Sequence, residues 1–156
     1  MEPRIDYQKM PDGAKQALYA LERHVRSSGL DPKLVELVKM RASLINGCAY
    51  CIDMHSKDAR AEGETEQRLY ALSAWRETPF YSERERAALE WTEAVTLVSQ
   101  NHVPDEVYER VRQHFDETEL INLTLAVIAI NGWNRLAISM RAVPGTYQRQ
   151  PAMAAR

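Results

Sequence analysis

Apolar residues recur every three or four positions along most of this chain, and no segment alternates apolar and polar residues as a series of strands would. Glycine and proline interrupt the pattern at intervals that suit short helices, at Gly29, Asn46–Gly47, Gly63 and Pro144–Gly145. There is no internal repeat. The sequence therefore predicts an all-α fold of about six to seven helices.

Capping residues and apolar faces place the expected helices. Asp31–Pro32 has the chemistry of an N-cap and a first turn, and Ser82 with Glu85 three residues later forms a capping box. The long helix that follows Ser82 is expected to bury Val98 near its end. The expected helical ranges are 12–28, 32–46, 48–62, 66–75, 82–98, 105–115 and 118–140.

Length and charge limit the domain organisation and the partners. With 156 residues, 45% of them hydrophobic, we expect one domain over residues 1–146 and a disordered tail, 147–156. Twenty Lys and Arg against 22 Asp and Glu give a formal charge of −2. The chain therefore lacks the excess of basic residues that is typical of a nucleic-acid binder or a polybasic membrane anchor. The apolar run 120–130 is about half as long as a membrane-spanning helix, and residues 1–7 lack the apolar core of a signal peptide. We therefore expect a cytoplasmic protein with no nucleic-acid or membrane partner.

The two cysteines carry most of the functional information. Cys48 and Cys51 are separated by two residues, and His55 follows four residues after Cys51. At about 100° per residue, these three side chains share one face of the expected helix 48–62. The unpaired N–H groups of its first turn and the helix dipole favour a thiolate, so the pKa of at least one sulfur is expected to be lowered. In a reducing compartment this pair indicates redox chemistry or metal binding rather than a permanent disulfide.

Glu36 is the first candidate for a partner of His55. It lies on the preceding expected helix, and antiparallel packing of helices 32–46 and 48–62 would bring it near His55. A carboxylate there could fix the tautomer of His55 and complete a proton relay from Cys51. The residues alone leave simpler interpretations open, because Glu36 could pair with Lys39 or Arg41 and His55 could be an ordinary core histidine.

Metal binding is the other interpretation of the cysteine pair. Zinc requires four ligands, and His24, His102 and His114 show no paired-ligand spacing that would complete such a site. The polar residues between Asn131 and Arg135 lie at the end of an apolar helix, where a buried hydrogen-bond cluster is the simpler interpretation. We expect no metal and no cofactor.

The segment from Glu36 to His55, with its Glu, Cys, Cys and His at these separations, resembles the alkylhydroperoxidase D (AhpD)-like core of the carboxymuconolactone decarboxylase family. The resemblance covers about residues 14–145 and implies an AhpD-like helical fold with the CxxC motif at the start of a helix. It also implies that the protein is an oxidoreductase that uses its thiols to reduce alkyl hydroperoxides. This is a peroxiredoxin-type activity, and its role would be antioxidant defence. The true γ-carboxymuconolactone decarboxylases lack the CxxC, which argues against decarboxylation.

The resemblance implies a role for each residue of the motif. Cys51 would be the peroxidatic cysteine and Cys48 the resolving cysteine, with a disulfide between them as the oxidised state. His55 would relay the proton and Glu36 would be the general base. Directly before Cys51, where well-studied peroxidatic members have a histidine, this chain has Tyr50.

The resemblance also implies the partners. These are a hydroperoxide substrate, an external dithiol reductant that in the best-known relatives is a lipoylated protein, and further copies of the chain in a dimer-based trimer or hexamer. Two other classes of function fit the residues. One is a disulfide reductase or redox relay without peroxidase activity, and the other is a non-enzymatic thiol sensor or zinc-binding helical module.

Overall fold

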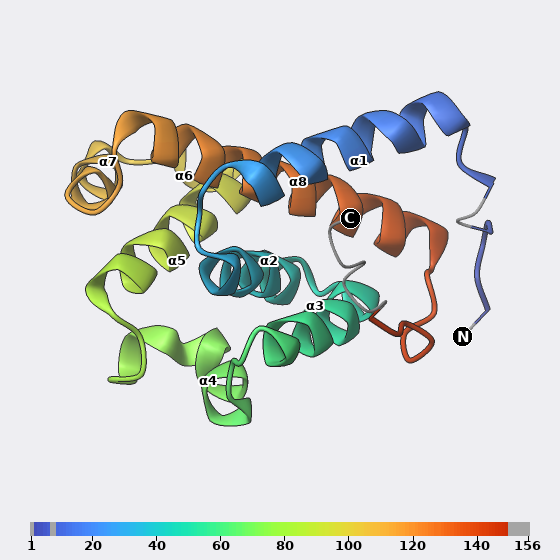
Figure 1. Cartoon of the computed structure of the whole chain (residues 1–156), viewed down its shortest axis with the longest axis horizontal. Helices are drawn as coiled ribbons and strands as arrows, with labels where there is room; N and C mark the ends of the chain where they lie inside the picture. Colours follow the sequence, from blue (N-terminus) through green and yellow to red (C-terminus); the bar gives the residue numbers. More distant parts are fainter. Residues whose placement is uncertain (1, 7–8, 150–156) are drawn as a thin grey trace, which may run out of the picture.

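The computed structural model describes residues 2–6 and 9–149, which form a bundle of α-helices with no strand among them (Figure 1). This confirms the all-α prediction. α2 lies at the centre, packed against α3, α5 and α8, and α1 packs against α8. In chain order the elements are α1 (Asp12–Ser27), α2 (Pro32–Asn46), α3 (Ala49–Ala61), α4 (Glu66–Ala71), the 3₁₀ segment η2 (Leu72–Glu77), α5 (Glu83–Thr96), α6 (Val98–Asn101), α7 (Asp105–Arg112) and α8 (Glu117–Met140).

The helix boundaries follow the capping residues read from the sequence. The Asp31 side chain accepts a hydrogen bond of 2.9 Å from a first-turn N–H of α2, and Ser82 and Glu85 form the capping box of α5. The end of α5 was predicted wrongly, because the helix stops at Thr96 and the four-residue α6 follows. Val98 is consequently 50% exposed instead of buried.

α8 presents an inner and an outer apolar face. Leu123, Val127 and Ile130 are fully buried inside the bundle, whereas Ile121 and Ile128 are 62% and 51% exposed. α8 is the one helix of the described chain that is long and apolar enough to cross a membrane, yet 44% of its most apolar window is buried in the bundle. Its contacts with α1, α2 and α5 make it a core helix.

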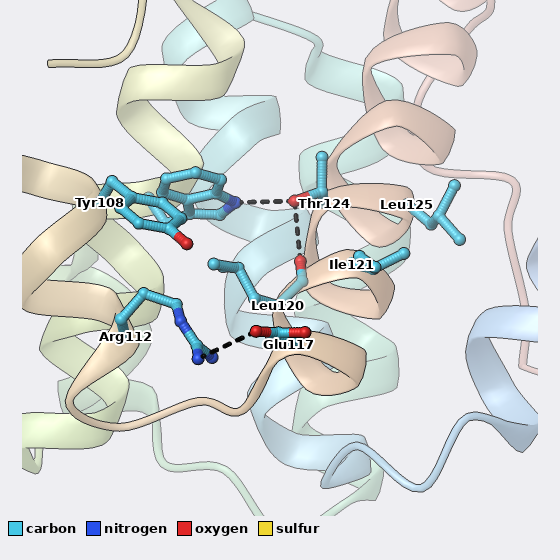
Figure 2. Close-up of a pocket in the computed structure, with 8 residues that line it drawn as sticks. Tyr108, Arg112, Glu117, Leu120, Ile121, Thr124 and Leu125 are labelled. Atoms are coloured by element: carbon cyan, nitrogen blue, oxygen red, sulfur yellow. Dashed lines mark hydrogen bonds and ion pairs between the residues drawn. The ribbon is translucent and has the colours of Figure 1, made fainter. Parts of the chain in front are cut away.

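A pocket of about 440 Å³ lies near the start of α8, where α5 and α7 approach it (Figure 2). Its mostly apolar lining includes Trp91 of α5, Tyr108 of α7, and Ile121 and Leu125 of α8. The Trp91 indole donates a hydrogen bond of 3.0 Å to the Thr124 hydroxyl, which fixes the indole against α8. The outer face of α8 is therefore continuous with an apolar hollow.

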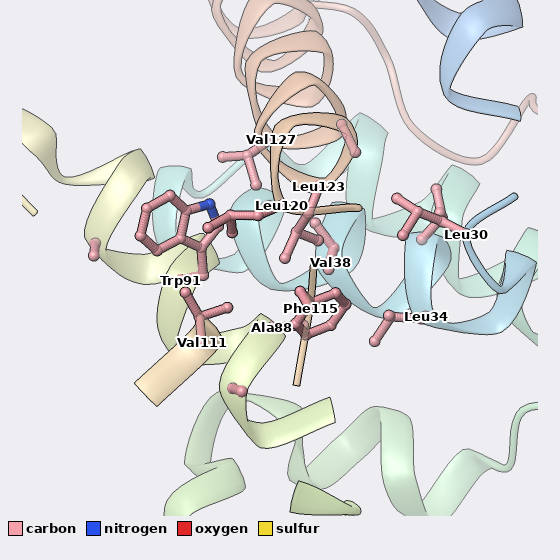
Figure 3. Close-up of a cluster of buried hydrophobic side chains, with 14 of the residues drawn as sticks. Leu30, Leu34, Val38, Ala88, Trp91, Val111, Phe115, Leu120, Leu123 and Val127 are labelled. Carbon is pink, nitrogen blue, oxygen red and sulfur yellow. The ribbon is translucent and has the colours of Figure 1, made fainter. Parts of the chain in front are cut away.

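Among the residues that the structure describes, the core forms three clusters, of which the largest joins α2, α5 and α8 around Val38, Phe115 and Leu123 (Figure 3). Burial of each such side chain contributes about 1.5–3 kcal/mol. A second cluster around Leu37, Leu72, Trp75 and Leu89 packs α2 and α5 against η2. The third cluster contains Cys48 and Cys51 with Ala42, Ile130 and Ala137, so that the cysteines lie between α2, α3 and α8.

The chain after α8 returns along α3. The Gly145 N–H donates to Asp53 Oδ2 at 3.0 Å, and the Lys57 ammonium donates to the Tyr147 carbonyl at 3.0 Å. Residues 147–149 of the expected tail thus lie against α3, and the rest of that tail, 150–156, lies outside the described residues.

Candidate active site

A sharp turn between α2 and α3 places the first cysteine at the start of α3. Gly47 ends α2 with φ 67°, a left-handed conformation that suits glycine because it has no Cβ. Cys48 follows as the N-cap residue of α3, and its Sγ accepts a hydrogen bond of 3.4 Å from the Cys51 N–H. The turn therefore places the Cys51 N–H, which has no partner within the helix, against the Cys48 sulfur, where it stabilises negative charge.

The two thiols are free, buried and coupled to one another. Each cysteine is 1% exposed. The hydrogen bond from the Cys51 side chain lowers the pKa of Cys48 to about 7, with contributions from the Cys51 N–H and the Asn134 amide, although burial opposes the charge. The same contact with Cys48, together with burial, raises the pKa of Cys51. The dithiol therefore loses its first proton near neutral pH, and the resulting charge is held on Cys48.

A buried amide cluster from α2 and α8 lies beneath the sulfurs. The Asn134 side chain is fully buried, donates to the Ser43 hydroxyl at 3.1 Å and accepts from the Asn46 amide at 2.9 Å. Asn46 also donates to Asn131 at 3.0 Å. The predicted hydrogen-bond cluster is thus present. The Asn134 amide also stabilises negative charge on both sulfurs, so Asn134 belongs to the site.

His55 and Glu36 form the second half of the site. His55 Nδ1 lies 2.9 Å from Glu36 Oε2, as the antiparallel packing of α2 and α3 predicted. Burial opposes ionisation of Glu36, but the His55 hydrogen bond and the cations Lys39 and Arg26 lower its pKa. An ionised Glu36 accepts a hydrogen bond from the Nδ1–H of His55, which leaves the lone pair on Nε2 available for a proton. His55 is 5% exposed and lies one helical turn after Cys51.

The structure therefore brings the four predicted residues together as two contacting pairs, Cys48 with Cys51 and Glu36 with His55. An ion pair with Lys39 or Arg41 explains little of how Glu36 is held. The Lys39 ammonium lies 4.0 Å from a Glu36 oxygen, and Arg41 forms its ion pair with Glu93. Glu36 is thus held mainly by the histidine that it was expected to contact.

A zinc site at the cysteines gains no support from the geometry. Within residues 2–6 and 9–149, no His, Asp or Glu joins the two sulfurs in a set of three closely spaced ligating atoms. His24 is bound instead to Asn122 at 2.9 Å, and His102 ends α6 in a left-handed conformation. The described residues therefore supply no third and fourth ligand of these types to complete a tetrahedral site with the two sulfurs.

Tyr50 occupies the position between the cysteines that faces their cluster. It is half-buried and packs against the cluster that contains Cys48 and Cys51. Burial raises its pKa, and the charge of Cys51 raises it further. Tyr50 therefore lies within electrostatic range of the sulfurs but remains a neutral phenol at physiological pH.

The sequence is similar to a known family and to several bacterial proteins. The model of the carboxymuconolactone decarboxylase family matches residues 11–94, just over half of the chain. The uncharacterized protein YdfG of Bacillus subtilis is 46% identical over 140 residues, which cover 90% of this chain and 95% of that protein. The uncharacterized protein YnjA of Escherichia coli is 35% identical over 107 residues, which cover 69% of this chain and 57% of YnjA.

Solved structures agree with the sequence comparisons. A protein of unknown function from Agrobacterium tumefaciens, described as a candidate antioxidant-defence protein AhpD, superposes with a TM-score of 0.90 at 44% identity, over 94% of this chain and all of that one. The debrominase Bmp8 superposes with a TM-score of 0.78 at 21% identity over 86% of this chain and 73% of its own, and so shows only a shared fold. The chain thus belongs to the carboxymuconolactone decarboxylase family and has an AhpD-like fold.

Proposed function

We propose that the protein is a thiol-dependent peroxidase that reduces alkyl hydroperoxides through its CxxC dithiol. The observation that carries this proposal is the placement of a free, buried cysteine pair at the start of α3, one turn before a histidine held by an ionised carboxylate. Such a site offers Cys51 a proton acceptor, His55, one helical turn away, and it holds a Cys48 thiolate near neutral pH for the resolving step. The AhpD description of the Agrobacterium relative supports the same activity, which we assign to antioxidant defence in the cytoplasm.

In the first step, Cys51 attacks the terminal oxygen of the hydroperoxide. Cys51 gives its proton to His55 Nε2, and Glu36 stabilises the imidazolium through its bond to Nδ1. The sulfur–oxygen bond forms as the oxygen–oxygen bond breaks, so that sulfur is oxidised to a sulfenic acid and an alkoxide leaves. The alkoxide takes the proton back from His55 and departs as the alcohol.

In the second step, Cys48 attacks the sulfenic acid of Cys51. The lowered pKa of Cys48, about 7, provides the thiolate that this step requires. The disulfide forms as hydroxide leaves, and the hydroxide takes up from solvent the proton that Cys48 had released on forming its thiolate, which gives water. An external dithiol, such as a lipoylated protein, then donates two electrons and two protons to restore both thiols.

A second candidate is a disulfide reductase or redox relay that does not use peroxide. The observation that favours it is the thiolate held on Cys48 at the N-cap, because a low-pKa first cysteine suits attack on a disulfide of another protein. In that case Cys48 would attack first and Cys51 would resolve the mixed disulfide.

Free-thiol titration separates the two candidates. The reduced protein is mixed with one equivalent of tert-butyl hydroperoxide, and thiols, disulfide and alcohol product are counted. A peroxidase loses both thiols and forms one molecule of alcohol per disulfide. Thiols that persist with the hydroperoxide but disappear with a small disulfide would reject the peroxidase and support the relay.

We further propose that the protein is a homo-oligomer built through the outer face of α8. Ile121 lines the neighbouring apolar pocket (Figure 2), and Ile128 is exposed further along the same helix. An apolar face of this kind suits contact with a second copy. Ile128→Asp should lower the mass measured by light scattering, whereas Val98→Asp, at an equally exposed position on α6, should not. Equal masses for Ile128→Asp and the wild type would reject this interface.

A further inference from the structure

A second carboxylate lies beside the Glu36–His55 pair. Asp58 is on α3, three residues after His55, and therefore shares its face of the helix. A carboxylate oxygen of Asp58, one of Glu36 and a ring nitrogen of His55 all lie within 4.8 Å of one another. The proton relay proposed above does not use Asp58, although this half-buried group is close enough to influence both members electrostatically.

Asp58 is held by a residue from the far end of the chain. The Tyr147 hydroxyl lies 2.9 Å from Asp58 Oδ1 and 3.1 Å from Oδ2, and it donates its single proton to this carboxylate. Tyr147 is half-buried against α3, and the Lys57 ammonium binds its carbonyl oxygen. The C-terminal segment therefore supplies one specific hydrogen-bond donor to the surroundings of the redox site.

Two neighbouring carboxylates oppose each other's ionisation. Burial raises the pKa of Asp58 and the charge of Glu36 raises it further, whereas the hydroxyl of Tyr147 acts in the opposite direction. The other charged groups that act on the two carboxylates are His55 of α3, Arg26 of α1, Lys39 of α2, itself ion-paired to Glu22, and Arg149 of the C-terminal segment. The proton occupancy of Asp58 is thus set first by its burial, and then by the Tyr147 hydroxyl and the charge of Glu36.

We propose that Asp58 and Tyr147 are positioning residues for the proton relay: ionised Asp58 adds a second negative charge that stabilises the His55 imidazolium, and the Tyr147 hydroxyl keeps Asp58 ionised. This inference rests on the proposed peroxidase function. As the pH falls, Asp58 takes up a proton and His55 loses one of its two stabilising charges, so the reaction slows. Tyr147 links this acid limb of the pH profile to the C-terminal segment.

The test compares Tyr147→Phe, Asp58→Asn and the control Lys57→Gln with the wild type. Lys57→Gln removes a tether of the same segment but leaves the Tyr147 hydroxyl on Asp58. The first readout is the NMR titration of the Asp58 carboxylate in the reduced protein, whose signal is assigned through its scalar couplings to the Asp58 backbone. The second is the pH profile of thiol oxidation by tert-butyl hydroperoxide.

Tyr147→Phe should move both the Asp58 midpoint and the acid limb to higher pH by about one unit, the tenfold change expected for one hydrogen bond to a charged group. Asp58→Asn should remove that limb and slow the reaction about 10-fold at neutral pH. Lys57→Gln should leave the midpoint and the limb unchanged.

If the titration midpoint of Asp58 were the same in Tyr147→Phe as in the wild type, the inference would be overturned. A shift of the same size in Lys57→Gln would also overturn it, because attachment of the segment would then be the cause rather than the hydroxyl. The NMR titration needs no peroxide, so a wild type that fails to react with hydroperoxide rejects the proposed function separately. Because Tyr147→Phe removes only one oxygen, it decides the question even where Asp58→Asn does not fold.

Discussion

The pKa of Cys48 depends first on its contact with Cys51, and removing that contact is a sharp test of the dithiol. In the wild type this pKa falls from 9.0 to about 7, which raises the ratio of thiolate to thiol about 100-fold. The resolving step, which uses the Cys48 thiolate, should therefore be slow below pH 7 and reach its plateau above it. Cys51→Ala removes the side-chain donor, and we expect the midpoint to rise by at least about one unit.

Cys51→Ser is the matched variant, because its hydroxyl still donates a hydrogen bond to Cys48. Its midpoint should stay nearer the wild-type value than that of Cys51→Ala. Ultraviolet absorbance against pH reads the thiolate of this buried group directly, without a reagent. A midpoint of about 7 in Cys51→Ala would refute the reasoning, because the helix N-terminus alone would then account for the lowered pKa of Cys48.

Three further substitutions test other parts of the site. Glu36→Gln should slow single-turnover thiol oxidation by hydroperoxide about 10- to 100-fold, because His55 loses the carboxylate that stabilises its charge; an unchanged rate would remove Glu36 from the relay. Tyr50→His should increase the same rate about 10-fold by adding a proton acceptor beside the sulfurs, and a slower variant would show that the phenol itself is needed. Asn134→Ala should lower the free energy of unfolding in urea by about 2 kcal/mol, because Ser43 and Asn46 lose a buried partner; a change near zero would mean that water replaces the amide.

Most of the fold could be predicted from the sequence because its signals are local. The Asp31 cap and the capping box of Ser82 and Glu85 act within one turn of the residues they stabilise, and both form as predicted. The end of α5 carries no glycine or proline, so the break after Thr96 had no comparable signal. The burial of Val98 was predicted on the assumption that α5 continues past Thr96, which it does not.

In the site, too, the contacts that local sequence signals indicate could be predicted and the others could not. Glu36 and His55 are linked by one turn between adjacent helices, so their approach follows from local geometry. Tyr147 reaches Asp58 from 89 positions away, and no pattern near either residue indicates that contact. The role of Asn134 depends likewise on the packing of α8 against α2, which brings its amide to sulfurs that are distant in sequence. Asp58 had one local signal, its spacing of three residues from His55.

The central claim is that Cys51 attacks the hydroperoxide and Cys48 resolves the product. The most direct measurement is mass spectrometry of dimedone adducts after one equivalent of tert-butyl hydroperoxide is added to Cys48→Ser and to Cys51→Ser. We expect a sulfenic-acid adduct on Cys51 in the first variant and no adduct in the second. An adduct on Cys48 in Cys51→Ser, with none on Cys51 in Cys48→Ser, would contradict the claim.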